Sequence, residues 1–337
     1  MRQSLAVRYR PTTFEDVVGQ SLTSTILSKM VEQNNLKNCY LFSGPSGTGK
    51  TTCARVFANA VNKGLGFPIE VDAASNNGVD DVRAIIEAAK TRALDCEYKI
   101  FIIDECHAIT NAGWQAFLLS LEETPPYTIY IFCTTEPNKI PEAVLNRMQR
   151  FSITKLTSTE IKDRLMDICL KEGFSNYAAA CDLISKTSHG CMRDAIMKLE
   201  QCADYSTDLI LANVNKVLNV SSYSAMLYLI CALYAKDTAS ILYTIDKLYN
   251  SGVDLKNFVE LFIEFTLDLA KFTIFNDISV TEIPEHLETD VRTVMVQVTD
   301  PAWYVDLVDT LLQIKLEIRY DSNFKSTIEA FLLRYCR

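Results

Sequence analysis

A glycine-rich stretch of eight residues constrains the fold of this 337-residue chain more than any other part of the sequence. Residues 44–51 are Gly-Pro-Ser-Gly-Thr-Gly-Lys-Thr and match the pattern GxxxxGK[ST]. Glycines let backbone N–H groups turn inward around phosphate oxygens, and the following helix points its N-terminus at the same anion. The stretch therefore predicts a phosphate-binding loop whose nucleotide contacts are Gly44, Pro45, Ser46, Gly47, Thr48, Gly49, Lys50, Thr51 and Thr52.

Two carboxylates are expected to act on the nucleotide together with this loop. Lys50 is placed to reach the β- and γ-phosphates, and the Thr51 hydroxyl is placed to ligate Mg²⁺. The apolar run 99–103 ends in Asp104 and Glu105. We expect Asp104 to hold Mg²⁺ through water and Glu105 to polarise the attacking water. Two acids that merely cap the next segment would be the better interpretation if the loop were absent.

Short apolar runs alternate with helical patterns through the first 156 residues, which is typical of a parallel sheet with crossover helices. Thr134 and Thr135 end the last apolar run, where a hydroxyl could hydrogen-bond the γ-phosphate or the attacking water. Ordinary strand threonines explain the same pair equally well. The predicted strands are 39–42, 69–72, 99–103 and 129–134, and the predicted helices are 49–60, 79–93 and 111–122, the last with Thr110 as N-cap.

The pattern becomes helical after Phe151, and we predict three domains. Residues 1–156 form the nucleotide-binding α/β domain, 157–220 a small helical bundle, and 221–337 a longer all-helical region. Gly173 and Gly190 mark breaks between helices of the bundle. The helices expected in the bundle are 159–172, 177–187, 192–203 and 209–218, and a last helix is expected at about 324–335.

The formal net charge of −9 argues at first against a role in nucleic-acid binding. The charge is unevenly distributed, however. Residues 1–156 carry 16 basic and 16 acidic side chains, whereas residues 221–337 carry 10 and 17. The acidity therefore belongs mainly to the last third of the chain, and the nucleotide-binding part is balanced.

Eleven cysteines suggest a metal or disulfide framework, but no CxxC pair occurs, so a structural zinc site is not expected. Reduced, buried thiols in a cytoplasmic protein are the simpler interpretation. Residues 1–14 carry three arginines and no apolar signal core. The most apolar long stretch, 258–275, contains Glu260, Glu264, Asp268 and Lys271, which predicts one solvent-exposed face of a packed helix rather than a membrane span.

With these motifs in place, the chain resembles AAA+ ATPases of the clamp-loader branch, and most of all the bacterial DNA polymerase III gamma/tau subunits. Small subunits of replication factor C are similar too, but Ala73-Ala74-Ser75-Asn76-Asn77-Gly78 and the position of His107 favour the gamma/tau group. The resemblance covers nearly the whole chain in layout and is densest over 1–200. Its other specific stretches are Tyr9 to Gln20, Asp104-Glu105-Cys106-His107, Leu121 to Pro126, and Gly190-Cys191-Met192-Arg193-Asp194-Ala195.

The resemblance implies an α/β P-loop AAA+ domain, a helical lid and an all-α collar. It also implies roles for individual residues. Val17, Val18 and Gly19, with Tyr9 nearby, should form the adenine pocket. Thr134, or failing that Thr135, takes the sensor-1 place. Arg193 in the lid takes the sensor-2 place at the γ-phosphate, and Arg147 takes that of the arginine finger, which reaches the ATP of a neighbouring subunit.

Three departures from the family pattern matter. Bacterial members usually insert a four-cysteine zinc module after the P-loop helix, and here only the short segment 62–68 lies there. The family's Ser-Arg-Cys around the arginine finger is Asn146-Arg147-Met148 here, so we expect a different partner interface. A long tail of the tau kind is not expected. Such a compact form would suit a virus-encoded clamp loader.

DNA would be held mainly through its phosphates, which helix N-termini attract. The candidates are Asn77 with the nearby Arg83, and Thr110 with Asn111, although ordinary helix caps explain these residues as well. His107 is interpreted as a hydrogen-bonded switch element beside Glu105. In the presumed collar, the apolar stripes 227–234 and 241–248 would form either an intramolecular core or faces for neighbouring subunits.

The sequence thus predicts the ATP- and Mg²⁺-dependent motor subunit of a sliding-clamp loader. ATP binding would order a ring, by analogy a five-subunit spiral, that opens the clamp and admits primer–template DNA. DNA-stimulated hydrolysis would then release the clamp. The location would be cytoplasmic, in the host cytoplasm if the chain is virus-encoded, without membrane contact. Two alternatives remain: another AAA+ DNA motor such as a Holliday-junction branch-migration helicase, and a non-catalytic clamp-loader scaffold.

Overall fold

The computed structural model describes residues 3–218, 222–319, 321 and 323–336. It divides into two compact units. The first unit comprises Met1–Ile168 and Ser188–Glu200, and the second comprises Cys169–Thr187 and Gln201–Arg337. The three predicted domains stay a prediction, and their boundary at 220/221 lies outside the described residues.

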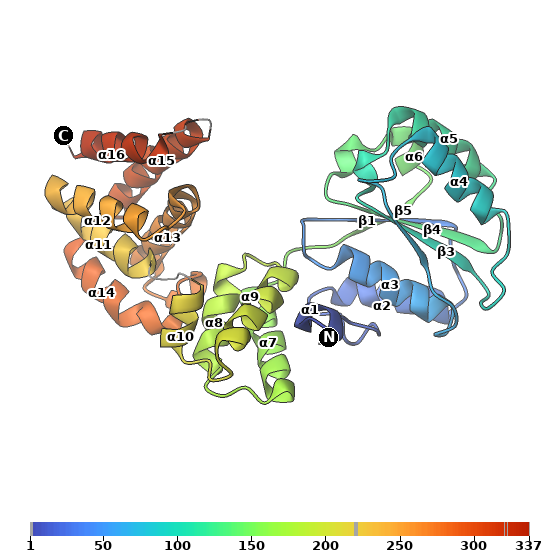
Figure 1. Cartoon of the computed structure of the whole chain (residues 1–337), viewed down its shortest axis with the longest axis horizontal. Coiled ribbons are helices and arrows are strands. Elements are labelled where there is room, and N and C mark those ends of the chain that lie inside the picture. The colour runs from blue at the N-terminus through green and yellow to red at the C-terminus, as the bar shows by residue number, and fades with distance from the viewer. Residues whose placement is uncertain (1–2, 219–221, 320, 322, 337) are drawn as a thin grey trace. The chain divides into compact units, whose positions relative to one another are not determined.

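The first unit, drawn in Figure 1, is built on a five-stranded parallel sheet. The strand order is β2-β3-β4-β1-β5. The predicted parallel sheet with crossover helices is therefore confirmed. The order places β1 between β4 and β5, so the chain crosses over within the sheet, and the end of β1 lies beside the end of β4. The strands are β1 (Cys39–Ser43), β2 (Ile69–Asp72), β3 (Lys99–Asp104), β4 (Thr128–Thr134) and β5 (Gln149–Ser152).

Helices cover both faces of the sheet, and each face has its own apolar core. On one face α2 and α3 pack on alternate residues of the central strands, such as Tyr40 and Ile102. On the other face α4, α5 and α6 pack on the residues between them, such as Leu41 and Phe132. Strands buried on both faces explain why the sequence shows continuous apolar runs there. The helices are α1 (Leu5–Arg8), α2 (Ser21–Glu32), α3 (Lys50–Val61), α4 (Val79–Ala89), α5 (Asn111–Glu122) and α6 (Glu142–Leu145).

The rest of the chain is helical, as predicted. Gly173 and Gly190, with φ of 73° and 81°, follow α7 and precede α9, at positions where glycine tolerates the left-handed backbone. The helices are α7 (Ser158–Glu172), α8 (Ala178–Thr187), α9 (Met192–Tyr205), α10 (Leu211–Val217), α11 (Ser222–Tyr234), α12 (Thr238–Asn250), α13 (Leu255–Phe275), α14 (Glu288–Gln297), α15 (Pro301–Ile318) and α16 (Phe324–Tyr335).

Helices α11 to α16 enclose one apolar core in the second unit. Of the two predicted stripes, Ile230, Ile241 and Ile245 are fully buried, whereas Tyr234 is 43% exposed. Apart from Tyr234, the stripes therefore serve mainly as an intramolecular core. In the part of the chain that the structure describes, no helix is both long and apolar enough to cross a membrane.

One expectation about α13 was wrong. Asp268 was predicted on the solvent-exposed face, but it is 6% exposed. Its carboxylate accepts hydrogen bonds from Lys271 Nζ at 2.7 Å and from the backbone N–H of Glu282 at 3.0 Å. Burial is tolerated because both carboxylate oxygens are hydrogen-bonded, and Asp268 thereby ties α13 to the segment that follows it.

Candidate nucleotide-binding site

The predicted phosphate loop lies between β1 and α3, as expected. Gly47 and Gly49 have φ of 70° and 101°, which side chains with a Cβ rarely adopt. Lys50 begins α3 and is 6% exposed. Its Nζ donates to the carbonyl oxygens of Gly44 at 3.0 Å and Pro45 at 2.9 Å. The ammonium group is therefore held at the loop, and it would exchange these carbonyls for phosphate oxygens when it contacts a nucleotide.

Gly47 has a second constraint, which yields a testable prediction. A Cβ added there would lie 2.0 Å from Cys191 Sγ, just before α9, whereas a Cβ on Gly49 would meet no atom within 4 Å. Backbone strain of about 1–2 kcal/mol applies at both positions, and overpacking adds about 1–3 kcal/mol at Gly47 alone. We expect Gly47→Ala to lower the free energy of unfolding in urea more than Gly49→Ala does. Equal losses, or no recovery when Cys191→Ala is added to Gly47→Ala, would contradict the contact.

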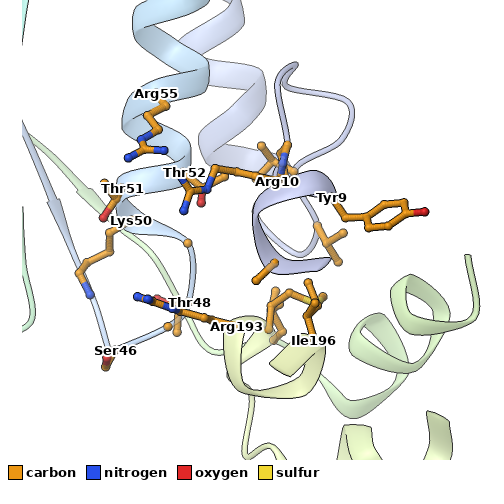
Figure 2. A pocket seen from close by; sticks show the side chains of 18 of the residues that line it. Tyr9, Arg10, Ser46, Thr48, Lys50, Thr51, Thr52, Arg55, Arg193 and Ile196 are labelled. Carbon is orange, nitrogen blue, oxygen red and sulfur yellow. The ribbon is translucent and has the colours of Figure 1, made fainter. Parts of the chain in front are cut away.

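A cavity of about 320 Å³ opens beside the loop and lies entirely within the first unit (Figure 2). Its volume is in the range of small-molecule sites. Most of the predicted nucleotide contacts line it: Tyr9, Val17, Val18, Ser46, Gly47, Thr48, Gly49, Lys50, Thr51, Thr52, Asp104, Glu105 and Arg193. Gly19, Gly44, Pro45, Thr134 and Arg147 are not among the lining residues.

Thr51, Asp104 and Glu105 all line the cavity and are joined by hydrogen bonds. Thr51 Oγ1 donates to Asp104 Oδ2 at 2.7 Å, and Asp104 Oδ1 accepts from the backbone N–H of Glu105 at 2.9 Å. Hydroxyl and carboxylate oxygens are ligands that Mg²⁺ prefers. The residues present therefore fit a magnesium ion that would be held by Thr51 and Asp104. Glu105 has φ of 47°, and this left-handed backbone turns its side chain off the end of β3.

Thr134 ends β4, next to the phosphate loop. It pairs with Ser43 of β1, and its carbonyl accepts from the N–H of Gly44 at 3.2 Å. Its buried hydroxyl lies 3.2 Å from His107 Nδ1 and accepts from the N–H of Glu136 at 2.9 Å. Thr134, the first of the two candidates for the sensor-1 position, is therefore held in place by hydrogen bonds next to His107. It does not line the cavity.

Residues from α1 and α9 border the cavity on its other side. The Arg193 side chain extends from α9 toward the loop, whereas the ring of Tyr9 points away from it (Figure 2). Val17 and Val18 supply apolar wall, as an adenine pocket requires. Gly19, with φ of 72°, lies behind this wall, because a Cβ on it would be 2.1 Å from Leu156 Cδ2, and Leu156 lines the cavity.

Arg147 lies just after α6, away from this chain's own cavity. Its Nη1 donates to the carbonyl of Ala143 at 2.6 Å, and its Nη2 pairs with the carboxylate of Glu122 on α5. The side chain is partly exposed, at 35%. Arg147 is not among the residues that line the cavity of its own chain, which is compatible with a role at another subunit's site.

Sequence reasoning missed an ion pair in the cavity wall. Arg55 on α3 pairs with Glu70 on β2, and both line the cavity. Arg55 lies four residues after Thr51, so helical periodicity could have placed the two on one face. Glu70 lies two residues before Asp72, which pairs with Asp104, but this register becomes visible only in the folded sheet. The other unpredicted lining residues are Ala6, Arg10, Pro11, Leu156, Arg164, Met192 and Ile196.

The four candidate DNA contacts lie at the starts of α4 and α5. Asn77 O accepts from the N–H of Thr110 at 3.1 Å, which brings the two helix starts together. The Thr110 side chain caps α5 through the N–H of Gly113, as predicted, and Arg83 is paired with Asp80 at 3.2 Å. Asn77, Arg83, Thr110 and Asn111 are all exposed.

Burial raises the pKa values of four cysteines in the first unit. It raises the pKa of Cys53 to about 11 and also raises the pKa values of Cys39, Cys106 and Cys133. None of the eleven cysteines, all of which lie in described residues, forms a disulfide. No cluster of three or more His, Cys, Asp or Glu side chains that could hold a metal occurs among the described residues.

Comparisons with known proteins identify a matching family and similar replication proteins. The model of the ATPase family associated with various cellular activities (AAA) matches residues 40–156. DNA polymerase III subunit tau of Bacillus subtilis is 31% identical over 99% of this chain and 63% of its own length. DNA polymerase III subunit gamma/tau of Mycoplasma genitalium is 32% identical over 85% of this chain and 52% of its own length. The chain thus spans between about half and two thirds of these relatives.

Among solved structures, the RuvB Holliday junction branch migration motor of Thermotoga maritima is similar, with a TM-score of 0.53. It is 20% identical, and the match covers 63% of this chain and 72% of that chain. At this identity the likeness shows the fold alone. The expected AAA+ architecture, with a helical region after the sheet, is confirmed.

Proposed function

Because the chain carries an AAA domain and is homologous to DNA polymerase III gamma/tau subunits over most of its length, we propose that it is an ATP-driven motor subunit of a sliding-clamp loader. One observation of the structure supports the proposed ATPase function most strongly. The Thr51 hydroxyl, the Asp104 carboxylate and the Glu105 backbone are joined by hydrogen bonds in the wall of a cavity that Lys50 and Arg193 also line.

Hydrolysis would proceed by in-line attack of water on the γ-phosphate of ATP. Lys50 binds the β- and γ-phosphates, and Thr51 and Asp104 hold Mg²⁺, which neutralises phosphate charge when it is bound. Glu105 accepts a proton from the attacking water, and Thr134 orients that water or the γ-phosphate. Arg193 binds the γ-phosphate from the lid. Val17 and Val18, with Tyr9 and Gly19 around them, enclose the base.

The partners follow from the same proposal. They are a sliding clamp, primer–template DNA and further loader subunits, arranged by analogy in a five-subunit spiral. DNA phosphates would meet the paired helix starts at Asn77 and Thr110, with Asn111 and Arg83 beside them. ATP and Mg²⁺ are the cofactors. The absence of a zinc module and a cytoplasmic location remain predictions.

The Holliday-junction helicase is the second candidate, and the likeness to RuvB supports it at the level of fold. A motor of that class should end in a compact basic module. Within the described residues from 222 onward the regular elements are helices, and residues 221–337 carry a net charge of −7. The gamma/tau homology also extends over most of this chain. These observations favour the loader.

The non-catalytic scaffold is the third candidate, and nucleotide binding tests it. A motor should bind a fluorescent ATP analogue with Mg²⁺ and should hydrolyse ATP faster when primed DNA and a clamp are present. A chain that binds no nucleotide would be a scaffold, and the proposed function would be wrong.

The finger role of Arg147 can be tested by mixing subunits. Arg147→Ala should bind ATP but hydrolyse it slowly, and Lys50→Ala should not bind ATP. If finger and phosphate loop act in different subunits, a mixture should recover activity that neither variant shows alone. The exposed Arg150→Ala is the matched control and should hydrolyse ATP normally. Unchanged activity in every mixture would remove Arg147 from the site.

A further inference from the structure

His107 connects the two strand ends that carry the hydrolytic groups. It lies in the short 3-10 turn Cys106–Ala108 directly after Glu105, and its side chain is 19% exposed. Its Nδ1 is 3.4 Å from Glu105 Oε2 and 3.2 Å from Thr134 Oγ1. Glu105 follows β3 and Thr134 ends β4, so one imidazole nitrogen faces a functional oxygen from each strand.

The Glu105 carboxylate lies close to His107 Nδ1 without being hydrogen-bonded to it. Glu105 Oε2 is buried and accepts no hydrogen bond from the described residues, although the side chain as a whole is 40% exposed. Buried carboxylate oxygens are costly when they face no donor. His107 Nδ1 is the nitrogen that faces this oxygen, at 3.4 Å, and when protonated it would be the donor that limits the rotation of the carboxylate.

The second imidazole nitrogen, Nε2, also has a polar neighbour. His107 Nε2 is 3.4 Å from Glu136 Oε1, and Lys139 Nζ donates to the same oxygen at 2.8 Å. The backbone N–H of Glu136 donates to Thr134 Oγ1 at 2.9 Å. The ring is thus fixed from both edges, and Thr134 is fixed from two directions.

We propose that His107 is a positioning residue for ATP hydrolysis, which uses Nδ1 to set the Glu105 carboxylate and the Thr134 hydroxyl in one fixed arrangement. This inference rests on the proposed function. The attacking water needs its proton acceptor and its hydrogen-bonding partner at defined places, yet these come from different strands. His107 contacts both groups and is not among the residues that line the cavity, so we assign it a role that acts through them.

Three substitutions of His107 separate this role from simple packing. Asparagine places an amide nitrogen where Nδ1 lies, glutamine places one where Nε2 lies, and leucine removes both. Single-turnover hydrolysis at saturating ATP should slow about 10- to 100-fold in His107→Leu, the usual consequence of a misplaced reacting group. His107→Asn should recover most of the rate and His107→Gln should not. The dissociation constant for a fluorescent ATP analogue should stay within about threefold of wild type, since binding is not the step affected.

A double variant shows whether His107 acts through Glu105. In the Glu105→Gln background, adding His107→Leu should slow hydrolysis less than it does in the wild-type background, because the part of the effect that passes through Glu105 is already lost. Wild-type rates in His107→Leu, or equal recovery by asparagine and glutamine, would overturn the inference while Glu105→Gln alone still loses turnover. A loss seen only in the thermal midpoint or in ATP affinity would likewise overturn it. A wild-type chain that binds no ATP would instead overturn the proposed function.

Discussion

Replacing Lys50 with alanine is expected to abolish ATP binding. The ammonium group is almost fully buried and lies at the loop, where it donates to two carbonyl oxygens. On binding it would donate to phosphate oxygens instead. Hydrogen bonds to charged groups contribute about 1.5–3 kcal/mol each, so losing two should weaken binding at least about 100-fold. Titration with a fluorescent ATP analogue in the presence of Mg²⁺ measures the dissociation constant.

A second variant shows that charge, not volume, is responsible. Lys50→Met keeps a chain of similar length without the ammonium, so it should lose affinity as Lys50→Ala does while unfolding closer to the wild-type temperature. The exposed Lys29→Ala on α2 is the surface control and should bind normally. Wild-type affinity in Lys50→Met would show that the phosphate loop is not used.

Replacing Glu105 with glutamine is expected to preserve ATP binding and stop turnover. The amide keeps the size and most of the hydrogen bonding of the carboxylate but does not accept the proton of the attacking water. General-base catalysis contributes about 10²- to 10⁴-fold, so the single-turnover rate should fall by that factor. The dissociation constant for ATP should change little, because Lys50, Thr51 and Asp104 are untouched.

The exposed Glu123→Gln, after α5, is the matched control and should hydrolyse ATP at the wild-type rate. Normal DNA-stimulated hydrolysis in Glu105→Gln would remove Glu105 from its assigned role. Loss of ATP binding in Glu105→Gln would assign it to binding rather than to catalysis.

The central strands could be predicted closely because each is a continuous buried apolar run. The central strands β1, β3 and β4 differ from the prediction by one residue each, and the edge strand β2 matches it although it is largely exposed. β5, the other edge strand, was not predicted, because Phe151 is its one apolar and its one buried side chain. The loop motif likewise placed the cavity, since most of its predicted contacts line it.

Features that depend on tertiary contacts could not be predicted. α4 was expected to reach residue 93 but ends at Ala89. The side chains of Lys99 and Thr128 donate hydrogen bonds to the carbonyl oxygens of Ala88 and Ala89. The last carbonyl groups of α4 are therefore bonded by β3 and β4 and not by a further turn of helix. The pairing of Arg55 with Glu70 and the burial of Asp268 have the same origin, because each depends on a partner from a separate element.

ATP-dependent binding to a sliding clamp tests the central claim most directly. The measurement is gel filtration of the purified full chain with the DNA polymerase III sliding clamp of the same genome, with and without ATP and Mg²⁺. Glu105→Gln should form a stable complex with the clamp in the presence of ATP, and Lys50→Ala should not. A chain that binds and hydrolyses ATP but elutes apart from the clamp under every condition would contradict the assignment as a clamp-loader motor.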